Sequence, residues 1–181
     1  MGQFTNHLAA DHKFGLPIIF GIINNHYGMT GRADDEVMGI DFMARRAAGF
    51  AENCMHAEVV NGMDVMAVRE AVLRAAKICR EGGGPVLLEF DTYRYYGHSL
   101  SDPRTEYRTK EEEGSWKGAD AIAAFEKQIV DTKVLSQKKL DELKQKVANR
   151  NARAAGKAAK AADPAPADVI KYMYTDTMAD V

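Results

Sequence analysis

The chain has 181 residues, of which 46% are hydrophobic and 28% are charged, a composition that supports a buried core and excludes a wholly disordered protein. Its 24 basic and 26 acidic side chains leave a net charge of -2, which argues against a protein that coats nucleic acid or lies on an anionic membrane. Two cysteines exclude a disulfide scaffold, and the longest apolar run, residues 16–23, is too short to span a bilayer. Because no signal peptide precedes that run, we expect a soluble intracellular protein.

Strand-like and helix-like segments alternate through the first 92 residues. Continuous apolar or β-branched runs predict strands, and helical spacing or capping signals predict the helices. The predicted strands are 17–23, 57–60 and 85–90, and we expect the first of them to be buried on both faces. The predicted helices are 2–14, a segment near 41–51, and about 17 residues that follow Asp64. Asp64 is the expected N-cap of the last helix, with an apolar stripe at Val65, Val68, Ala71, Val72 and Ala75. Short glycine-containing turns between these segments predict parallel pairing, and therefore part of a doubly wound α/β domain.

The second half of the chain is predicted to be helical after a long loop. Residues 93–118 have a loop-like composition, and helices are expected at 118–131 and 136–162, the latter with Ser136 as its N-cap. Residues 137–160 hold eight basic and two acidic side chains, which we interpret as a solvated helical face. We therefore expect a partial α/β domain over residues 1–108 and a C-terminal helical region over residues 109–181.

Two polar segments follow predicted strands, at the sheet edge where ligands of such folds bind. Asn24 and Asn25 end the first strand, and Gly28 allows the backbone there to approach a ligand closely. An amide oxygen and a backbone carbonyl two residues further on suit Mg²⁺. The alternative is a plain turn, since asparagine fits turns readily.

The segment 93–103 follows the third predicted strand and leaves the sheet at the same edge. It combines His98 with Arg94 and the hydroxyls of Ser99 and Ser101, residue types that concentrate in functional loops. The alternative is a surface loop with a hydrogen-bonded histidine. Elsewhere, His26 and His56 have no nearby partner of the right type for a site, and Cys54 and Cys79 are interpreted as small core residues.

Taken together, these segments resemble the alpha subunit of the first component of pyruvate dehydrogenase, a thiamine diphosphate-dependent 2-oxo acid dehydrogenase. The motifs that carry the resemblance are PIIFGIINNHYGM at 17–29, NGMD at 61–64, GPVLLEFDTYRYYGHSLSDP at 84–103 and YRTKEE at 107–112. Their order and spacing match the family from about Gly2 to Pro164.

The resemblance implies thiamine diphosphate and Mg²⁺ as cofactors. In that family the metal is held by an Asp of a Gly-Asp-Gly turn, by the Asn that corresponds to Asn25, and by the carbonyl of the residue that corresponds to Tyr27, followed here by Gly28. His98 matches the histidine that hydrogen-bonds the cofactor's phosphate. Ser99 stands at the position that is phosphorylated to switch off mitochondrial members, whereas Glu106 occupies the other such position.

The resemblance also implies the activity: oxidative decarboxylation of pyruvate, with transfer of the acyl group to a lipoyl group. The Gly-Asp-Gly turn is absent from this sequence, and Asn6 and Ala9 replace the usual Glu and Asn. We therefore expect the isolated chain to bind the cofactor poorly and to be inactive. Two alternatives stay open, a split alpha subunit and a catalytically inert paralogue that serves as a structural or assembly subunit.

The partners follow from the same resemblance. We expect a beta subunit in an alpha2beta2-type assembly, the lipoyl-bearing acyltransferase component and, for a split subunit, a separate N-terminal chain that supplies the Gly-Asp-Gly turn. Neither nucleic acid nor a membrane is expected as a partner. The expected location is the mitochondrial matrix in a eukaryote and the cytoplasm otherwise.

Overall fold

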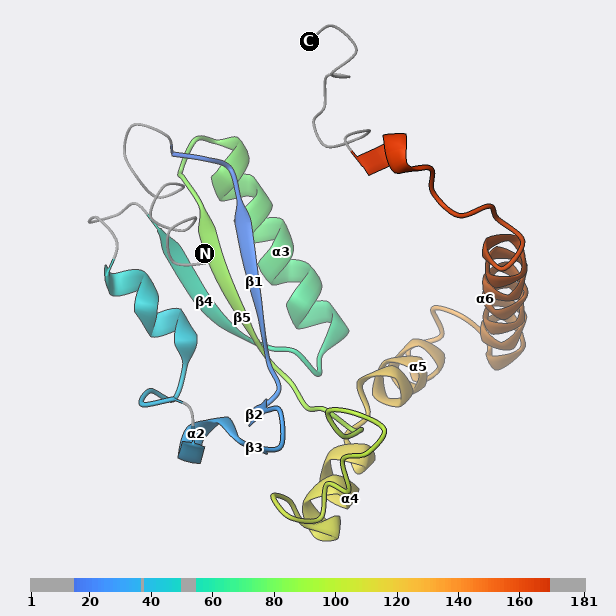
Figure 1. The fold of residues 1–181 in the computed structure, drawn as a ribbon, viewed down its shortest axis with the longest axis horizontal. Helices are drawn as coiled ribbons and strands as arrows, with labels where there is room; N and C mark the ends of the chain where they lie inside the picture. The colour runs from blue at the N-terminus through green and yellow to red at the C-terminus, as the bar shows by residue number, and fades with distance from the viewer. Residues whose placement is uncertain (1–14, 37, 50–54, 170–181) are drawn as a thin grey trace, which may run out of the picture. The chain divides into compact units, whose positions relative to one another are not determined.

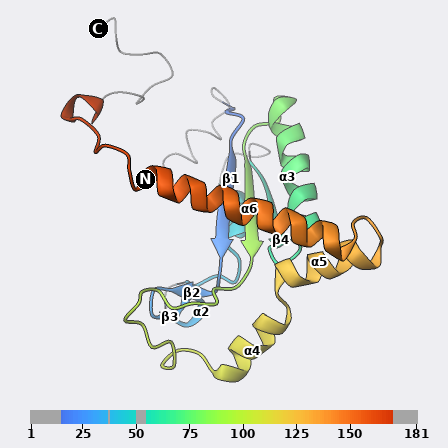
Figure 2. The ribbon, with the colours of Figure 1, turned by 90° about the vertical axis from the view of Figure 1, so that its right-hand side faces the viewer.

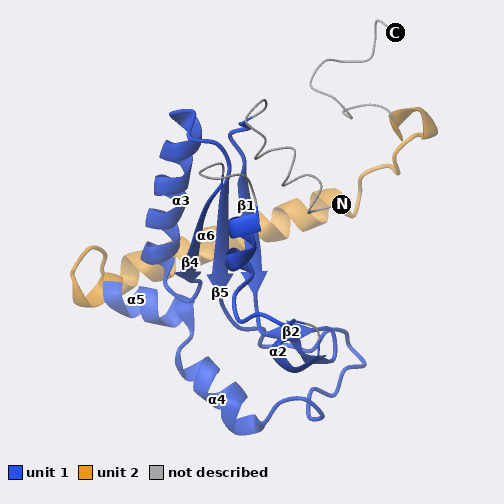
Figure 3. Cartoon of the chain, turned by 90° about the vertical axis from the view of Figure 1, so that its left-hand side faces the viewer, with its two compact units in different colours: residues 1–128 blue, residues 129–181 orange. Residues whose placement is uncertain are grey.

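A computed structural model describes residues 15–36, 38–49 and 55–169 of the chain. The chain separates into two compact units, residues 1–128 and 129–181 (Figure 3). The predicted helix over residues 2–14, together with Asn6, Ala9 and Cys54, lies outside the described residues. The predicted division after residue 108 stays a prediction.

A three-stranded parallel sheet lies at the centre of the first unit (Figure 1). Its strands are β1 (Ile19–Asn24), β4 (His56–Asn61) and β5 (Val86–Asp91), in the spatial order β1-β5-β4. The α/β fold class and the parallel pairing are therefore confirmed. In this register β5 pairs Asp91 with Asn24 on one side and with Asn61 on the other, so all three strands end at the same edge.

The strands differ in how deeply they are buried. Residues 86–89 of the central strand β5 are all buried, and neither Leu88 nor Glu89 has any exposed surface. The expectation that the first strand is buried on both faces is wrong, because β1 is an edge strand of the described sheet and Ile23 is 64% exposed. A continuous apolar run marks a strand without revealing how many neighbours cover it.

Helix α3 (Val65–Arg80) covers one face of the sheet (Figure 1). The predicted cap is confirmed, since Asp64 Oδ1 accepts hydrogen bonds from the backbone N–H groups of Met66 (2.8 Å) and Ala67 (3.1 Å). The buried side chains on this face form one apolar cluster: Val60, Ala71, Ala75, Cys79, Val86 and Leu88. The predicted stripe is wrong at Val65 and Val72, which are exposed, whereas the core assignment of Cys79 is confirmed.

The 3₁₀ helix η1 (Met43–Gly49) contacts β4 and β5 and lies across the sheet from α3 (Figure 1). It replaces the α-helix predicted over residues 41–51, within which residues 50–51 are not described. The backbone N–H of Ala44 donates a 2.7 Å hydrogen bond to Glu89 Oε2. A buried carboxylate of the central strand therefore holds this turn of helix on the sheet.

A small hairpin and a short helix follow β1 at its carboxyl end (Figure 1). The hairpin pairs β2 (Tyr27–Gly28) with β3 (Gly31–Arg32), and α2 (Ala33–Glu36) continues directly from it. The sequence predicts only a turn at residues 24–28. The positive backbone φ angles there belong to His26 and Met29, at 65° and 57°, although glycine favours that region most strongly.

Helices make up most of the remaining described chain. They are α4 (Lys110–Gly118), α5 (Ala121–Asp131), α6 (Gln137–Ala158) and the short η2 (Pro166–Val169). The predicted loop over 93–118 is wrong from Lys110 onward, because Thr109 Oγ1 caps α4 by accepting from the Glu112 N–H. Ser136 caps α6 as predicted. No helix in the described ranges combines the length and apolar character that crossing a membrane requires.

The burial of β5 generates a stability prediction. Leu88→Ala removes a side chain with no exposed surface and leaves a cavity, so we expect it to lower the free energy of unfolding by about 3 kcal/mol. Ile23→Ala, at a side chain that is 64% exposed, should cost less than about 1 kcal/mol. Urea denaturation followed by circular dichroism measures both values. Equal losses in the two variants would contradict the assignment of β5 as the centre of the core.

Candidate functional site

The turn after β1 and the loop after β5 leave the sheet at the same edge, as predicted (Figure 2). Asn24 and Asp91 are register partners, and the Thr92 N–H donates a 2.9 Å hydrogen bond to the Asn24 carbonyl. Asn25, Tyr27 and Gly28 follow the end of β1, and His98 and Ser99 follow the end of β5. The structure therefore brings the two segments to one edge of the sheet.

Asn24 has a structural role at this edge. Its side chain is buried, its Nδ2 donates a 2.7 Å hydrogen bond to Glu89 Oε1, and its Oδ1 accepts from the His26 N–H at 3.2 Å. Because both ends of the amide are used within the fold, Asn24 has little capacity left for a ligand.

Asn25 and Tyr27 offer oxygen atoms of different kinds. Asn25 is half-buried, and its Oδ1 accepts a 3.1 Å hydrogen bond from the Tyr27 N–H. The Tyr27 hydroxyl donates to a Glu112 carboxylate oxygen. Burial and then this hydrogen bond raise the pKa of Tyr27 well above its usual value. The phenol is thus neutral and already bonded, which leaves the backbone carbonyl of Tyr27 as its candidate ligand atom.

His26 forms a side-chain hydrogen bond that the sequence did not predict. Its Nε2 lies 2.6 Å from Asp91 Oδ1, and the two side chains are 34% and 37% exposed. The expectation that His26 has no nearby partner of the right type is therefore wrong, because Asp91 is a carboxylate within hydrogen-bonding distance. Asp91 closes β5 and His26 lies two residues beyond β1, so the adjacency of these strand ends was the available signal. The contact ties the turn that carries Asn25 to the strand that leads into the His98 loop.

Both segments contribute side chains to an arginine–tyrosine cluster, formed by Tyr27, Tyr93, Arg94, Tyr107 and Arg108. The Arg94 guanidinium lies 5.1 Å from the centroid of the Tyr27 ring, and that of Arg108 lies 5.4 Å from it. Cations over aromatic faces are stabilising, more so where water is excluded. The cluster therefore joins the turn after β1 to the loop after β5.

Backbone and ionic contacts fix the two arginines of this cluster. Arg94 donates to the Met29 carbonyl at 2.7 Å, which holds the β2–β3 hairpin. The Arg108 side chain has no exposed surface, and its Nε lies 2.8 Å from Glu113 Oε1. Its other nitrogens donate to the Arg94 carbonyl and, at 3.1 Å, to the Tyr95 carbonyl. Arg108 thus closes the chain from Arg94 to α4 into one packed loop, a role that the sequence did not reveal.

Asp102 organises the segment around His98. Its side chain is 1% exposed, and it accepts hydrogen bonds from the His98 N–H (2.7 Å), the Arg104 N–H (2.8 Å) and the Tyr107 hydroxyl. Those donors, Tyr107 foremost, lower the pKa of Asp102 to about 2. A Cβ at Gly97 would lie 2.9 Å from the side chain of Asp102, so only glycine allows this close approach.

His98 itself is exposed, and its described hydrogen bond runs within its own loop. Ser99 Oγ lies 3.0 Å from Ser101 Oγ. A hollow of about 490 Å³ is lined by Tyr96, Gly97, His98, Ser99, Leu100, Asp102 and Arg104. The described contacts join His98 to neither Asn25 nor Tyr27, so the structure brings the two segments to one edge without bringing these side chains together.

The donor set fits Mg²⁺ only in part. No three His, Cys, Asp or Glu side chains gather into a metal-binding group within the described residues. The amide oxygen of Asn25 and the carbonyl oxygen of Tyr27 are hard ligands of the type that Mg²⁺ prefers, but both are neutral. Because Mg²⁺ sites generally also use a carboxylate and phosphate oxygens, these two atoms can form only part of such a site.

Comparisons with known proteins agree with the motifs. Residues 1–167 match the model of the family described as "Dehydrogenase E1 component". The chain is 38% identical over 176 residues to the mitochondrial pyruvate dehydrogenase E1 component subunit alpha of Dictyostelium discoideum, covering 96% of this chain and 45% of that protein. It is 32% identical over 175 residues to the pyruvate dehydrogenase E1 component subunit alpha of Porphyra purpurea, covering 97% and 49%. The chain thus spans less than half the length of these relatives.

The environment of Asp102 predicts a pH dependence of stability. Its pKa is about 2 in the fold, against an ordinary value of 3.8, so the charged carboxylate stabilises the folded state. This stabilisation is complete above about pH 4 and is lost as the pH falls toward 2. Urea midpoints should therefore show that Asp102→Asn is less stable than wild type at pH 6, with a gap that narrows below pH 4. A gap that stays constant down to pH 2 would contradict this role.

Proposed function

Because the chain belongs to the dehydrogenase E1 component family, we propose that it forms part of the alpha subunit of a pyruvate dehydrogenase. The proposed reaction is the oxidative decarboxylation of pyruvate, with transfer of the acetyl group to a lipoyl group. The observation that carries the proposal is the meeting of two segments at one sheet edge, the Asn24–Gly28 turn and the loop around His98.

Thiamine diphosphate, when bound, supplies the carbon nucleophile for decarboxylation, and this chain holds the diphosphate end. We assign the side-chain oxygen of Asn25 and the backbone carbonyl of Tyr27 as ligands of Mg²⁺. Gly28, which has no side chain, leaves room for the cofactor beside the hairpin. His98 donates an N–H to a diphosphate oxygen, which orients the cofactor for catalysis. Two features support this assignment. The side chain of Asn24 is hydrogen-bonded to buried Glu89, whereas the described hydrogen bond of the Asn25 side chain is to the Tyr27 N–H within the turn.

An anionic ligand must complete the proposed magnesium site. The described residues offer neutral oxygen atoms at Asn25 and Tyr27 and no group of three metal-binding side chains. The isolated chain is therefore proposed to bind Mg²⁺ and thiamine diphosphate weakly and to be inactive alone. A carboxylate supplied from a Gly-Asp-Gly turn, in the same subunit or on a separate N-terminal chain, would restore the site.

The proposed assembly follows from the same function. A beta subunit completes an alpha2beta2-type enzyme, and the lipoyl-bearing acyltransferase component accepts the acetyl group. For a eukaryotic source, the mitochondrial matrix is the proposed location. The inert-subunit alternative is not favoured, since the family match spans residues 1–167 and includes the His98 loop.

Replacing the two asparagines separately tests the metal assignment. In the assembled enzyme, Asn25→Ala should raise the Mg²⁺ concentration for half-maximal thiamine diphosphate binding at least about tenfold, because a ligand oxygen is lost. Asn24→Ala breaks the bond to buried Glu89, so it should lower the free energy of unfolding by about 1–3 kcal/mol. Calorimetric titration and urea denaturation measure the two effects. An equal Mg²⁺ requirement in both variants would show that Asn25 is not the ligand.

Introducing a negative charge at either of two nearby serines tests whether the His98 loop borders the diphosphate. Ser99 is also the proposed regulatory phosphorylation site, where a phosphate would add negative charge beside His98. We expect Ser99→Glu to reduce activity strongly in the assembled enzyme, and Ser101→Glu, whose hydroxyl lies 3.0 Å from that of Ser99, to reduce it less. Steady-state rates at saturating pyruvate give the comparison. Full activity in both variants would remove Ser99 and His98 from the site.

A further inference from the structure

Helix α6 carries a concentration of positive charge that the proposed cofactor site does not use. Residues 137–160 hold eight basic and two acidic side chains, although the chain as a whole has a net charge of -2. In contrast, residues 1–128 hold 19 acidic and 14 basic side chains. The charge of the protein is therefore divided between an acidic body and a basic helix.

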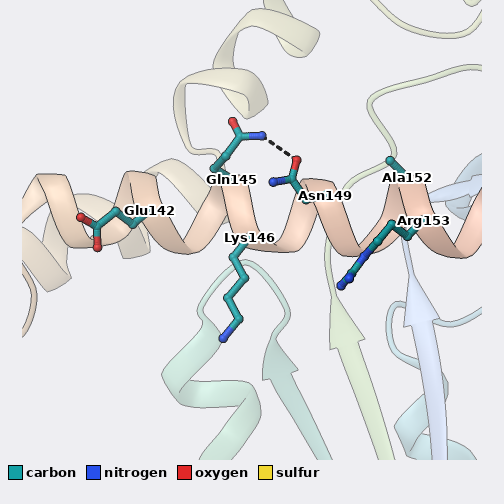
Figure 4. Close-up of a pocket in the computed structure, with 6 residues that line it drawn as sticks. All are labelled: Glu142, Gln145, Lys146, Asn149, Ala152 and Arg153. Atoms are coloured by element: carbon teal, nitrogen blue, oxygen red, sulfur yellow. Dashed lines mark hydrogen bonds between the residues drawn. The ribbon is translucent and has the colours of Figure 1, made fainter.

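Five of these cations form a basic stripe: Lys139, Lys146, Arg150, Arg153 and Lys157. At 100° per residue, the five positions fall within about 60° of the helix circumference. All five are exposed. Figure 4 shows Lys146 and Arg153 projecting from the same side of α6, away from Gln145 and Ala152.

The charges of the basic stripe are largely uncompensated. Lys139 Nζ lies 3.5 Å from Glu142 Oε2. The other four cations have no carboxylate within ion-pair distance among the described residues. Positive charges held in a row on a fixed helix repel one another, so an anionic partner would bind there with a gain in electrostatic energy.

An apolar strip borders the basic stripe on the same helix. It contains Leu143 and Val147, which are 49% and 38% exposed, and Ala154. Lys139, Lys146 and Arg153 recur every seven residues beside it, as the charged flanking positions of a coiled coil do. This pattern suits a second helix that packs on the apolar strip and places carboxylates opposite the stripe.

We propose that α6 is a docking surface for an acidic amphipathic helix of another protein. The stripe extends about 27 Å from Lys139 to Lys157, so the partner helix needs carboxylates every three to four residues over that length. A second copy of α6 is disfavoured because like charges would face each other.

Other anionic partners fit the same observations less well. No residue of α6 is aromatic, so it offers no ring on which bases could stack. It also lacks the large aromatic side chains that commonly anchor interfacial helices in membranes.

The test uses the full chain and a defined probe, a fluorescently labelled 21-residue helical peptide with Leu at its apolar heptad positions and Glu at the flanking ones. We expect the peptide to bind in 150 mM salt, and the same peptide with Lys in place of Glu to bind at least about tenfold more weakly. Lys146→Ala with Arg153→Ala should weaken binding of the Glu peptide about tenfold. Alanine favours helix, so α6 should still form, and circular dichroism checks this.

Gln145→Glu with Ala152→Glu is the matched control. It changes the net charge by the same amount, at two positions that are also seven residues apart, but on the opposite side of α6 in Figure 4. We expect it to alter binding by no more than about twofold. Absence of binding by the Glu peptide, or equal weakening in the two double variants, would overturn the proposal. So would tighter binding to phosphatidylserine vesicles or to a 20-base-pair DNA duplex.

Discussion

The arrangement of the candidate site depends on one buried carboxylate. Glu89 lies in the central strand with no exposed surface, and its two oxygens accept hydrogen bonds from Asn24 and from the backbone of Ala44. A carboxylate in such a place is very costly unless its oxygens are bonded. The sheet is therefore built so that the end of β1 and the 3₁₀ helix η1 both meet β5 at this point. The shape of the turn that carries Asn25 follows from that constraint.

The loop after β5 is held by a second buried charge of opposite sign. Arg108 is enclosed by tyrosine rings, backbone carbonyls and Glu113, and it connects the start of the loop to α4. Asp102 then shapes the segment that contains His98. Together, Glu89, Arg108 and Asp102 hold the turn after β1 and the loop after β5 in place. The imidazole of His98 and the side chain of Ser99 stay exposed. A rigid frame with exposed functional groups is the arrangement expected of a site completed by a ligand or a partner.

Local signals predicted the elements well where the deciding interaction is local. Asp64 and Ser136 cap α3 and α6 through bonds to backbone groups two or three residues away, and such bonds are encoded in a few consecutive residues. Helix α4 is an exception, because its cap is equally local: Thr109 Oγ1 accepts from the Glu112 N–H three residues further on, although the polar composition of residues 93–118 predicts a loop. The error at β1 is of another kind, because exposure depends on which neighbours a strand receives.

The sequence by itself determined the parallel α/β fold, the strand ends at which the polar motifs lie, and the resemblance that places the chain in its family. Each of these depends on residue type and order along the chain. Only the tertiary structure decided that His26 contacts Asp91, that the Tyr27 hydroxyl donates to Glu112, and that the Asn24 side chain donates to Glu89. These partners are 65 to 85 residues apart. Their pairing is set by strand order and register, which bring distant strand ends together, and no local pattern of residues records that adjacency.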